Sequence, residues 1–158
     1  MSKDQFNKQL YTIIKILSIP MRILGLDYGK KRIGIAISDE EGKYAFPYQV
    51  LENRNKFFVF DNLKIIVQQE KVEKIIVGLP LNLKGEREKK AKECEDFANK
   101  LNSYLNLPVE LEDERLTSRL SSRLLRDNPS KKAKKKEAID QQSAILILQG
   151  YLDRQNNQ

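Results

Sequence analysis

Two short apolar segments separated by a tight turn most constrain how this chain can fold. Residues 21–28 (MRILGLDY) and 33–38 (IGIAIS) have the length and apolar content of buried strands. The turn at residues 29–32 (GKKR) predicts that these strands form a hairpin. A third strand is predicted over residues 43–51, at an edge of the sheet, because Pro47 has no N–H to donate to a neighbouring strand.

The rest of the chain alternates between helical and strand patterns. Strands are predicted at residues 74–79 and 108–113, and helices at 55–70, 86–105, 117–126 and 134–153, with a turn at 127–130. The resulting order is βββ-α-β-α-β-α-α, a meander followed by crossover connections. It predicts an α/β fold in which helices cover a mixed sheet of five strands.

The length of 158 residues favours one domain, since ~150 residues per domain is typical. We expect this domain over residues 21–153, followed by a short tail at 154–158. Residues 1–20 do not resemble the rest of the chain, and Met21 could be an alternative start. Apolar residues at helical spacing predict a loosely attached helix at about residues 4–18, without a catalytic role.

The side chains that the sequence lacks exclude several classes of enzyme. The chain has no histidine, which excludes Ser-His-Asp triads, Cys-His dyads and HExxH zinc sites. Its one cysteine, Cys94, cannot form an internal disulfide or a cysteine-built zinc site. An enzyme with this composition must work with carboxylates, lysines, hydroxyls and a bound metal ion.

The apolar segments are too short or too interrupted to predict a membrane anchor. The run at residues 144–148 is far shorter than a bilayer span, and Lys15 interrupts the run near the N-terminus. No small-residue cleavage pattern follows that run, so a signal peptide is not predicted. Together with the single unpaired cysteine, this favours a cytoplasmic protein.

Two carboxylates stand in otherwise apolar segments. Asp27 ends the first strand between Gly25 and Gly29, and burying an isolated charge there would cost several kcal/mol, of order 3–5 if left unpaired. Asp140 shares a helix face with Ala144, at an offset of four residues, and with further residues that should pack on the sheet. We expect that helix to bring Asp140 towards Asp27. Alternatively, Asp27 caps a turn and Asp140 is a polar residue at the rim of the helix face.

A third acidic cluster leaves the fifth strand at residues 110–115 (ELEDER). Alternation places Asp113 on one face of that strand, and Glu110, Glu112 and Glu114 on the other. Either Asp113 or Glu114 could reach inward, because alternation can break at the end of a strand. The longer glutamate spans the gap to the first strand more easily. A solvated acidic edge strand would account for Glu110 and Glu112.

Acids from two strands and a helix, without histidine, suit hard cations that prefer oxygen ligands. Two such ions ~3.5–4 Å apart can stabilise the attacking and leaving oxygens of an in-line phosphoryl displacement. The sequence therefore predicts a site for Mg²⁺ or Mn²⁺ built from Asp27, Glu114 and Asp140. A metal-bound water would supply the nucleophile.

A large cationic reserve accompanies these acids. Lysine and arginine total 29 against 22 acidic residues, and nine of the cations fall within residues 115–136, where Asp127 is the one acid. A solvated surface normally intersperses both signs, so we expect contacts with the phosphate backbone of a nucleic acid. The candidate contact residues are Lys30, Lys31, Arg32, Arg115, Arg119, Arg123, Arg126 and Lys134.

Four segments together resemble one protein family. They are residues 26–34 (LDYGKKRIG), 77–85 (VGLPLNLKG), 113–118 (DERLTS) and 140–152 (DQQSAILILQGYL). In this order and at these spacings they are similar to the YqgF family, also named RuvX. The resemblance spans about residues 21–153.

That family is described as Holliday-junction resolvases and as nucleases that mature the end of pre-16S ribosomal RNA. The resemblance implies an RNase H-like sheet of three antiparallel strands followed by two parallel strands. It also implies catalytic acids at Asp27, at the Asp113–Glu114 pair and at Asp140. It gives no preference between an RNA and a branched DNA, nor between a monomer and a homodimer.

Three classes of function are compatible with these features. The first is a metal-dependent nuclease that acts on structured nucleic acid. The second is a phosphate-binding domain related to sugar kinases and actin-like ATPases, suggested by the Asp27 hairpin, although 158 residues leave no room for the second domain that those proteins need. The third is a non-catalytic RNA-binding assembly factor that keeps the fold and the basic surface.

Overall fold

A computed structural model describes residues 1–17, 22–80, 86–114 and 132–157. Five strands form one sheet: β1 (Arg22–Tyr28), β2 (Arg32–Ser38), β3 (Ala45–Glu52), β4 (Val72–Leu79) and β5 (Val109–Asp113). Their spatial order is β3-β2-β1-β4-β5. The pairs β1–β2 and β2–β3 are antiparallel, whereas β1–β4 and β4–β5 are parallel. The predicted mixed sheet is confirmed, with β3 at its edge.

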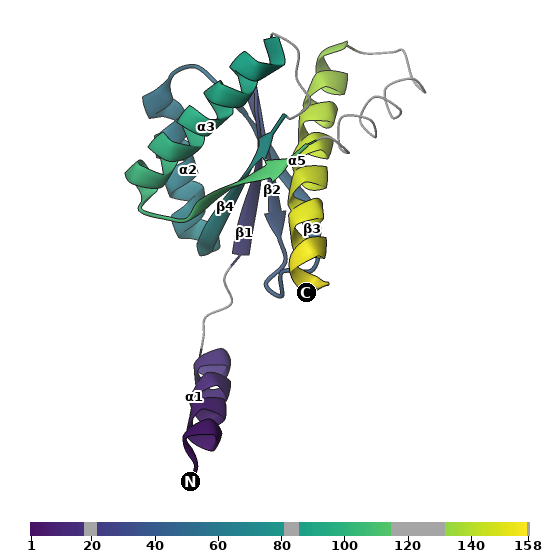
Figure 1. Cartoon of the computed structure of the whole chain (residues 1–158). Coiled ribbons are helices and arrows are strands. Elements are labelled where there is room, and N and C mark those ends of the chain that lie inside the picture. The colour runs from purple at the N-terminus through teal and green to yellow at the C-terminus, as the bar shows by residue number, and fades with distance from the viewer. Residues whose placement is uncertain (18–21, 81–85, 115–131, 158) are drawn as a thin grey trace.

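Helices cover both faces of this sheet (Figure 1). The helices α2 (Lys56–Glu70) and α3 (Glu86–Leu105) pack on one face, and α5 (Lys132–Asn156) packs on the other. The ends of β1 and β4 that carry the highest residue numbers lie at the same end of the molecule as the first turns of α3 and α5 (Figure 1). The fold therefore collects residues from four elements at one end of the sheet.

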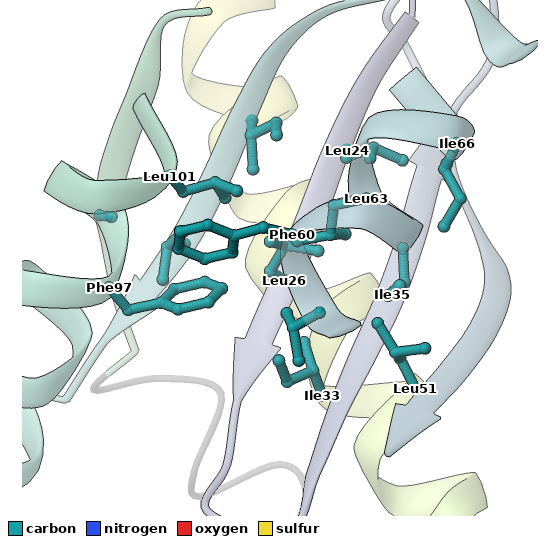
Figure 2. Close-up of a cluster of buried hydrophobic side chains, with 14 of the residues drawn as sticks. Leu24, Leu26, Ile33, Ile35, Leu51, Phe60, Leu63, Ile66, Phe97 and Leu101 are labelled. Carbon is teal, nitrogen blue, oxygen red and sulfur yellow. The ribbon is translucent and has the colours of Figure 1, made fainter. Parts of the chain in front are cut away.

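The main hydrophobic core lies between the sheet and the helices α2 and α3. Figure 2 shows Leu26 of β1 and Ile35 of β2 packing with Phe60 of α2 and Phe97 of α3. Leu26 and Ile35 are fully buried. Since burying one such side chain contributes ~1.5–3 kcal/mol, this layer holds the sheet rigidly beneath the opposite face.

The helix α5 covers the opposite face of the sheet with the apolar side chains that helical spacing predicts to be buried. Ala144, Ile147 and Tyr151 are all buried there. The helix ends at Asn156 rather than at residue 153, because its last turn is held by side chains. Arg154 pairs with Glu112 of β5, and the Asn156 side-chain amide donates to the Gly42 carbonyl over 3.1 Å. Part of the expected tail is thus helical.

The bounds of α2 and β4 have a local cause. Asn55 caps α2 by accepting a hydrogen bond from the Phe58 amide over 3.0 Å. Lys71 ends the helix in the left-handed conformation, at φ 53°, and the chain enters β4 at Val72. The strand therefore starts two residues earlier than the apolar pattern at 74–79 predicts. The predicted helix at 117–126 and the turn at 127–130 lie outside the described residues.

The N-terminal segment forms a helix, α1 (Lys3–Leu17), that stands apart from the sheet (Figure 1). Its apolar side chains Phe6, Leu10 and Ile13 are exposed. The division of the chain at residue 20 stays a prediction. None of the helices within the described ranges is long and apolar enough to cross a membrane.

Candidate active site

Asp27 lies between two glycines on neighbouring strands. It pairs with Gly34 of β2. The last paired residues of β1 and β4 are Leu26 and Val77, so the next residue of β4, Gly78, is the one expected beside Asp27. Neighbouring residues at one level of a sheet project to the same face. Asp27 therefore points to the face that α5 covers, and no side chain beside it on β2 or β4 shields it.

Asp140 reaches this point because α5 lies directly on Gly34. A Cβ atom on Gly34 would lie 2.1 Å from the Asp140 carbonyl oxygen, so no larger residue fits beneath the helix. The Asp140 carboxylate accepts a 2.8 Å hydrogen bond from Arg32 Nε at its Oδ2 atom. It also raises the pKa of Asp27, as expected for a like charge nearby. The structure thus brings Asp27 and Asp140 together.

Glu114, the residue directly after β5, faces the same side. In the register of β4 with β5, Gly78 faces Glu112 and Leu79 faces Asp113. The Glu114 amide donates to the Leu79 carbonyl over 3.0 Å, so the strand geometry continues past Asp113. Glu114 is 9% exposed, and its Oε1 atom lies 2.1 Å from where a Cβ of Gly78 would stand. The structure places Glu114, rather than Asp113, over the sheet beside Asp27.

Burial and like charges raise the pKa of both central acids. Burial, above all, lifts the pKa of Asp27 to about 6, with a further increase from Asp140. The pKa of Glu114 rises to about 7, first through burial and then through the negative charges of Asp27 and Asp113. Lys90 lowers both values. The site therefore holds a concentration of negative charge that a bound cation would stabilise.

Sequence reasoning missed Lys90, the cation that α3 brings to these acids. It is exposed near the start of α3, four residues before the buried Cys94. That offset places both residues on one side of the helix, and this was the signal available in the sequence. The pKa of Cys94 rises to about 12, mainly through burial and next through Glu114. Burial and the raised pKa both disfavour the thiolate, which is the nucleophilic form of a cysteine.

The expectation of a solvated acidic edge is wrong for Glu112. This side chain is 4% exposed, and its two carboxylate oxygens accept from the two Nη groups of Arg154 in α5. Glu110 fits the expectation better, since it is exposed and pairs with Lys74 at 2.9 Å. Alternation along β5 and the residue that follows it directs Glu110, Glu112 and Glu114 towards α5, and of these three Glu114 adjoins Asp27.

The structure describes some of the predicted cationic residues and leaves others outside its described ranges. Lys30 and Lys31 are exposed on the turn between β1 and β2. Arg32 is half-buried against Asp140, so it is part of the acidic site. Lys134 lies in α5, and only its backbone position is described. The remaining candidates, Arg115, Arg119, Arg123 and Arg126, lie outside the described residues.

The acids fit a hard divalent cation by their chemistry, although they are not gathered as a finished metal site. Across the described ranges, no three carboxylate or cysteine side chains lie closely enough to hold a metal ion. Mg²⁺, however, commonly uses one or two carboxylates together with water and substrate phosphates. Asp27 and Glu114 provide that pair of carboxylates, and the negative charge of Asp27 raises the pKa of Glu114.

Comparisons with known proteins agree with this arrangement. A profile of the RuvX family, described as Holliday junction resolvase, matches residues 21–154. A Bacillus cereus protein is 42% identical over 136 residues, which cover 85% of this chain and 99% of its own. A Syntrophomonas wolfei protein is 43% identical over 133 residues, which cover 84% of this chain and 94% of its own. Both relatives are named "Putative pre-16S rRNA nuclease".

Solved structures resemble the fold at low sequence identity. T. thermophilus RuvC in complex with a Holliday junction substrate has a TM-score of 0.54 at 11% identity, covering 86% of this chain and 96% of that one. Fowlpox virus resolvase in complex with Holliday junction DNA has a TM-score of 0.52 at 12% identity, covering 85% and 99%. These likenesses support the RNase H-like fold. The family match decides against a kinase-like domain, and the predicted class of nuclease is confirmed. This chain belongs to the RuvX family.

Proposed function

We propose that this protein is a divalent-metal-dependent nuclease that trims the 5′ end of pre-16S ribosomal RNA. The observation that carries the proposal is the half-buried Asp27, flanked by Gly34 and Gly78, with Glu114 and Asp140 beside it. The name of the curated relatives favours the ribosomal RNA substrate. A pre-ribosomal RNA substrate would also place the protein in the cytoplasm.

Each acid has a proposed part in this activity. Asp27 and Glu114 would hold Mg²⁺ or Mn²⁺ together with water, and Asp140, which does not complete a three-carboxylate site in this structure, would join them when the metal binds. The bound ion would supply an activated water and charge stabilisation for the phosphodiester. Arg32 orients Asp140 through its 2.8 Å contact, and Lys90 offsets the charge of Asp27 and Glu114. Asp113 contributes less directly, by raising the pKa of Glu114.

Cations around the acids would hold the nucleic-acid backbone. Lys30 and Lys31 are exposed on the turn that follows Asp27, so they can reach a phosphate close to the acids. The cations after Glu114 would extend this contact along the chain; they are Arg115, Arg119, Arg123, Arg126 and Lys134. Contacts of this kind position a nucleic acid without reading its sequence.

Cleavage of matched substrates tests the proposal. The purified protein is incubated with an RNA that carries the extended 5′ end of 16S RNA, with a mature-end RNA and with a four-way DNA junction. Each substrate is assayed with Mg²⁺, with Mn²⁺ and with a chelator. We expect cleavage of the extended RNA alone, dependent on metal. Tight RNA binding without cleavage under any metal would instead indicate a non-catalytic assembly factor.

Junction resolution is the second candidate, favoured by the description of the family profile and by the junction in the RuvC structure. A resolvase must cut two strands related by a two-fold axis, so it should act as a homodimer, whereas an RNA trimmer can act as a monomer. The mass of the protein in solution, measured with and without a four-way junction, separates the two. Paired cuts by a dimer on the junction would replace the ribosomal RNA assignment.

We predict that replacing Arg119, Arg123 and Arg126 together with glutamine weakens binding to all nucleic acids. Phosphate contacts carry no base information, so preference among substrates should barely change. Each lost contact flattens the dependence of log K on log salt by ~0.7–0.9, so three should flatten it by about 2–3 units. Cleavage at saturating substrate should change much less, because the acids remain.

A variant with the same loss of charge provides the control for this prediction. Lys8, Lys71 and Lys100 are exposed on α1, at the end of α2 and in the later half of α3, away from Asp27. Their joint replacement by glutamine also removes three positive charges, but the salt slope should be retained. An unchanged slope in the arginine variant would remove that segment from the nucleic-acid interface.

A further inference from the structure

We infer that Gly78 is a positioning residue for the Glu114 carboxylate. The space that a side chain at residue 78 would fill is occupied by the Glu114 head group: a Cβ there would lie 2.1 Å from Oε1 and 2.8 Å from Cδ of Glu114. Real Cβ atoms do not approach other atoms so closely. The absence of a side chain at Gly78 therefore leaves the space that the Glu114 carboxylate occupies beside Asp27. This inference rests on the proposed metal-dependent activity.

The position of Gly78 in the sheet explains why this space matters for Glu114. Gly78 belongs to β4, which lies between the strand of Asp27 and the strand that leads to Glu114. Glu114 must cross β4 to approach Asp27, and it does so pressed against the sheet, with 9% of its surface exposed. A methyl group at residue 78 would raise the carboxylate off the sheet and away from its present place beside Asp27.

Other glycines beneath α5 meet different atoms. A Cβ on Gly25 would lie 2.6 Å from the Cβ atom of Leu148, and one on Gly34 would lie 2.1 Å from the Asp140 carbonyl oxygen. Both positions accommodate the body of the helix. At Gly78 the nearest atom belongs instead to the flexible end of an acidic side chain, followed by Cδ1 of Ile147 at 2.5 Å.

This difference predicts whether a substitution at residue 78 lowers folding stability or metal affinity. Gly78 lies within β4, and it is not among the described residues with positive φ, so alanine is compatible with its backbone. The Glu114 side chain can rotate away more cheaply than a backbone can move. Gly78→Ala should therefore leave the sheet intact and displace the carboxylate. The loss should appear in metal affinity rather than in folding.

The test is Mn²⁺ binding by titration calorimetry, in the absence of nucleic acid, on the full-length chain. Groups that support a metal ligand typically change affinity by ~10–100-fold, so we expect Gly78→Ala to weaken Mn²⁺ binding by at least about tenfold. In a Glu114→Gln background the same substitution should change the affinity little further. Such non-additivity is the signature of a residue that acts through Glu114, and a purely structural role would not produce it.

Two further variants separate positioning from packing. Gly25→Ala introduces a comparable clash against α5 without touching an acid, so it should lower the melting temperature and leave the Mn²⁺ affinity of the folded protein unchanged. Ile147→Val removes the Cδ1 atom that a new Cβ at residue 78 would meet. If Gly78→Ala unfolds the protein, the double variant Gly78→Ala/Ile147→Val is used instead. Its Mn²⁺ affinity is then compared with that of Ile147→Val alone.

Each outcome decides the inference. Equal Mn²⁺ binding by the wild type and a folded Gly78→Ala variant would overturn it alone, and so would a full additional loss in the Glu114→Gln background. Unfolding of Gly78→Ala both alone and in combination with Ile147→Val would show that residue 78 serves packing, and would overturn it as well. A wild type that binds no Mn²⁺ would overturn the proposed metal site, and this inference with it.

Discussion

Replacing Asp27 with asparagine should abolish metal-dependent cleavage while making the metal-free protein more stable at pH 8. The substitution is nearly isosteric and removes the carboxylate at the centre of the site. Losing a direct ligand should cost more than the ~10–100-fold that supporting groups cost, so activity should fall by at least about 10²-fold. Cleavage rates with Mg²⁺ and Mn²⁺ on the same substrate measure this loss.

The gain in stability follows from the raised pKa of Asp27. In the folded protein this pKa is about 6, and its ordinary value is 3.8. Between these values the folded state binds more protons than the unfolded state, so the free energy of unfolding falls as pH rises. The penalty is absent below pH 3.8 and complete above pH 6. Asparagine carries no charge, so the variant escapes the penalty.

Melting temperatures at pH 5 and pH 8, measured without metal, test this part. At pH 8 Asp27→Asn should melt a few degrees above the wild type, since 1 kcal/mol corresponds to ~2–4 °C for a domain of this size. Asp96→Asn, a matched change at an exposed acid of α3, should alter neither activity nor stability. A folded Asp27→Asn variant that cleaves at the wild-type rate would exclude Asp27 as a metal ligand.

The sequence predicted the sheet well because its signals are local. The apolar runs, the turn at residues 29–32 and Pro47 each report on their own strand, and the order of elements then limits the topology. The stripe on α5 is equally local, because helical spacing alone places Ala144 and Ile147 on the buried side. Each of these features depends only on residues that are close together in the sequence.

The features that the sequence did not predict depend on partners distant in the chain. Glu112 reads as an exposed acid until Arg154, 42 residues later, is brought against it. Lys90 becomes part of the acidic site only when α3 lies beside β4 and β5. Whether Asp113 or Glu114 faces inward depends on one hydrogen bond, from the Glu114 amide to Leu79, which continues the strand geometry. Tertiary contacts decided each case.

The two neighbouring acids at the end of β5 should therefore behave very differently when neutralised. Glu114→Gln should reduce metal-dependent cleavage by at least about 10²-fold, because it removes the carboxylate beside Asp27. Asp113→Asn should retain most activity, because Asp113 faces the other side of β5. The two substitutions differ by one position and remove the same charge, so each is the control for the other. Cleavage rates at pH 8 and saturating Mn²⁺ give the comparison.

The pH dependence of Mn²⁺ binding distinguishes the two acids further. Glu114 has a pKa of about 7, and metal binding requires its ionised form, so the affinity of the wild type should rise between pH 6 and pH 8. Asp113 is one cause of that raised pKa. Asp113→Asn should therefore lower the pKa of Glu114 and shift the affinity profile towards acid pH. Glu114→Gln should bind Mn²⁺ weakly at every pH and lose this rise. A larger loss from Asp113→Asn than from Glu114→Gln would instead make Asp113 the inward ligand, with the end of β5 turned over when metal binds.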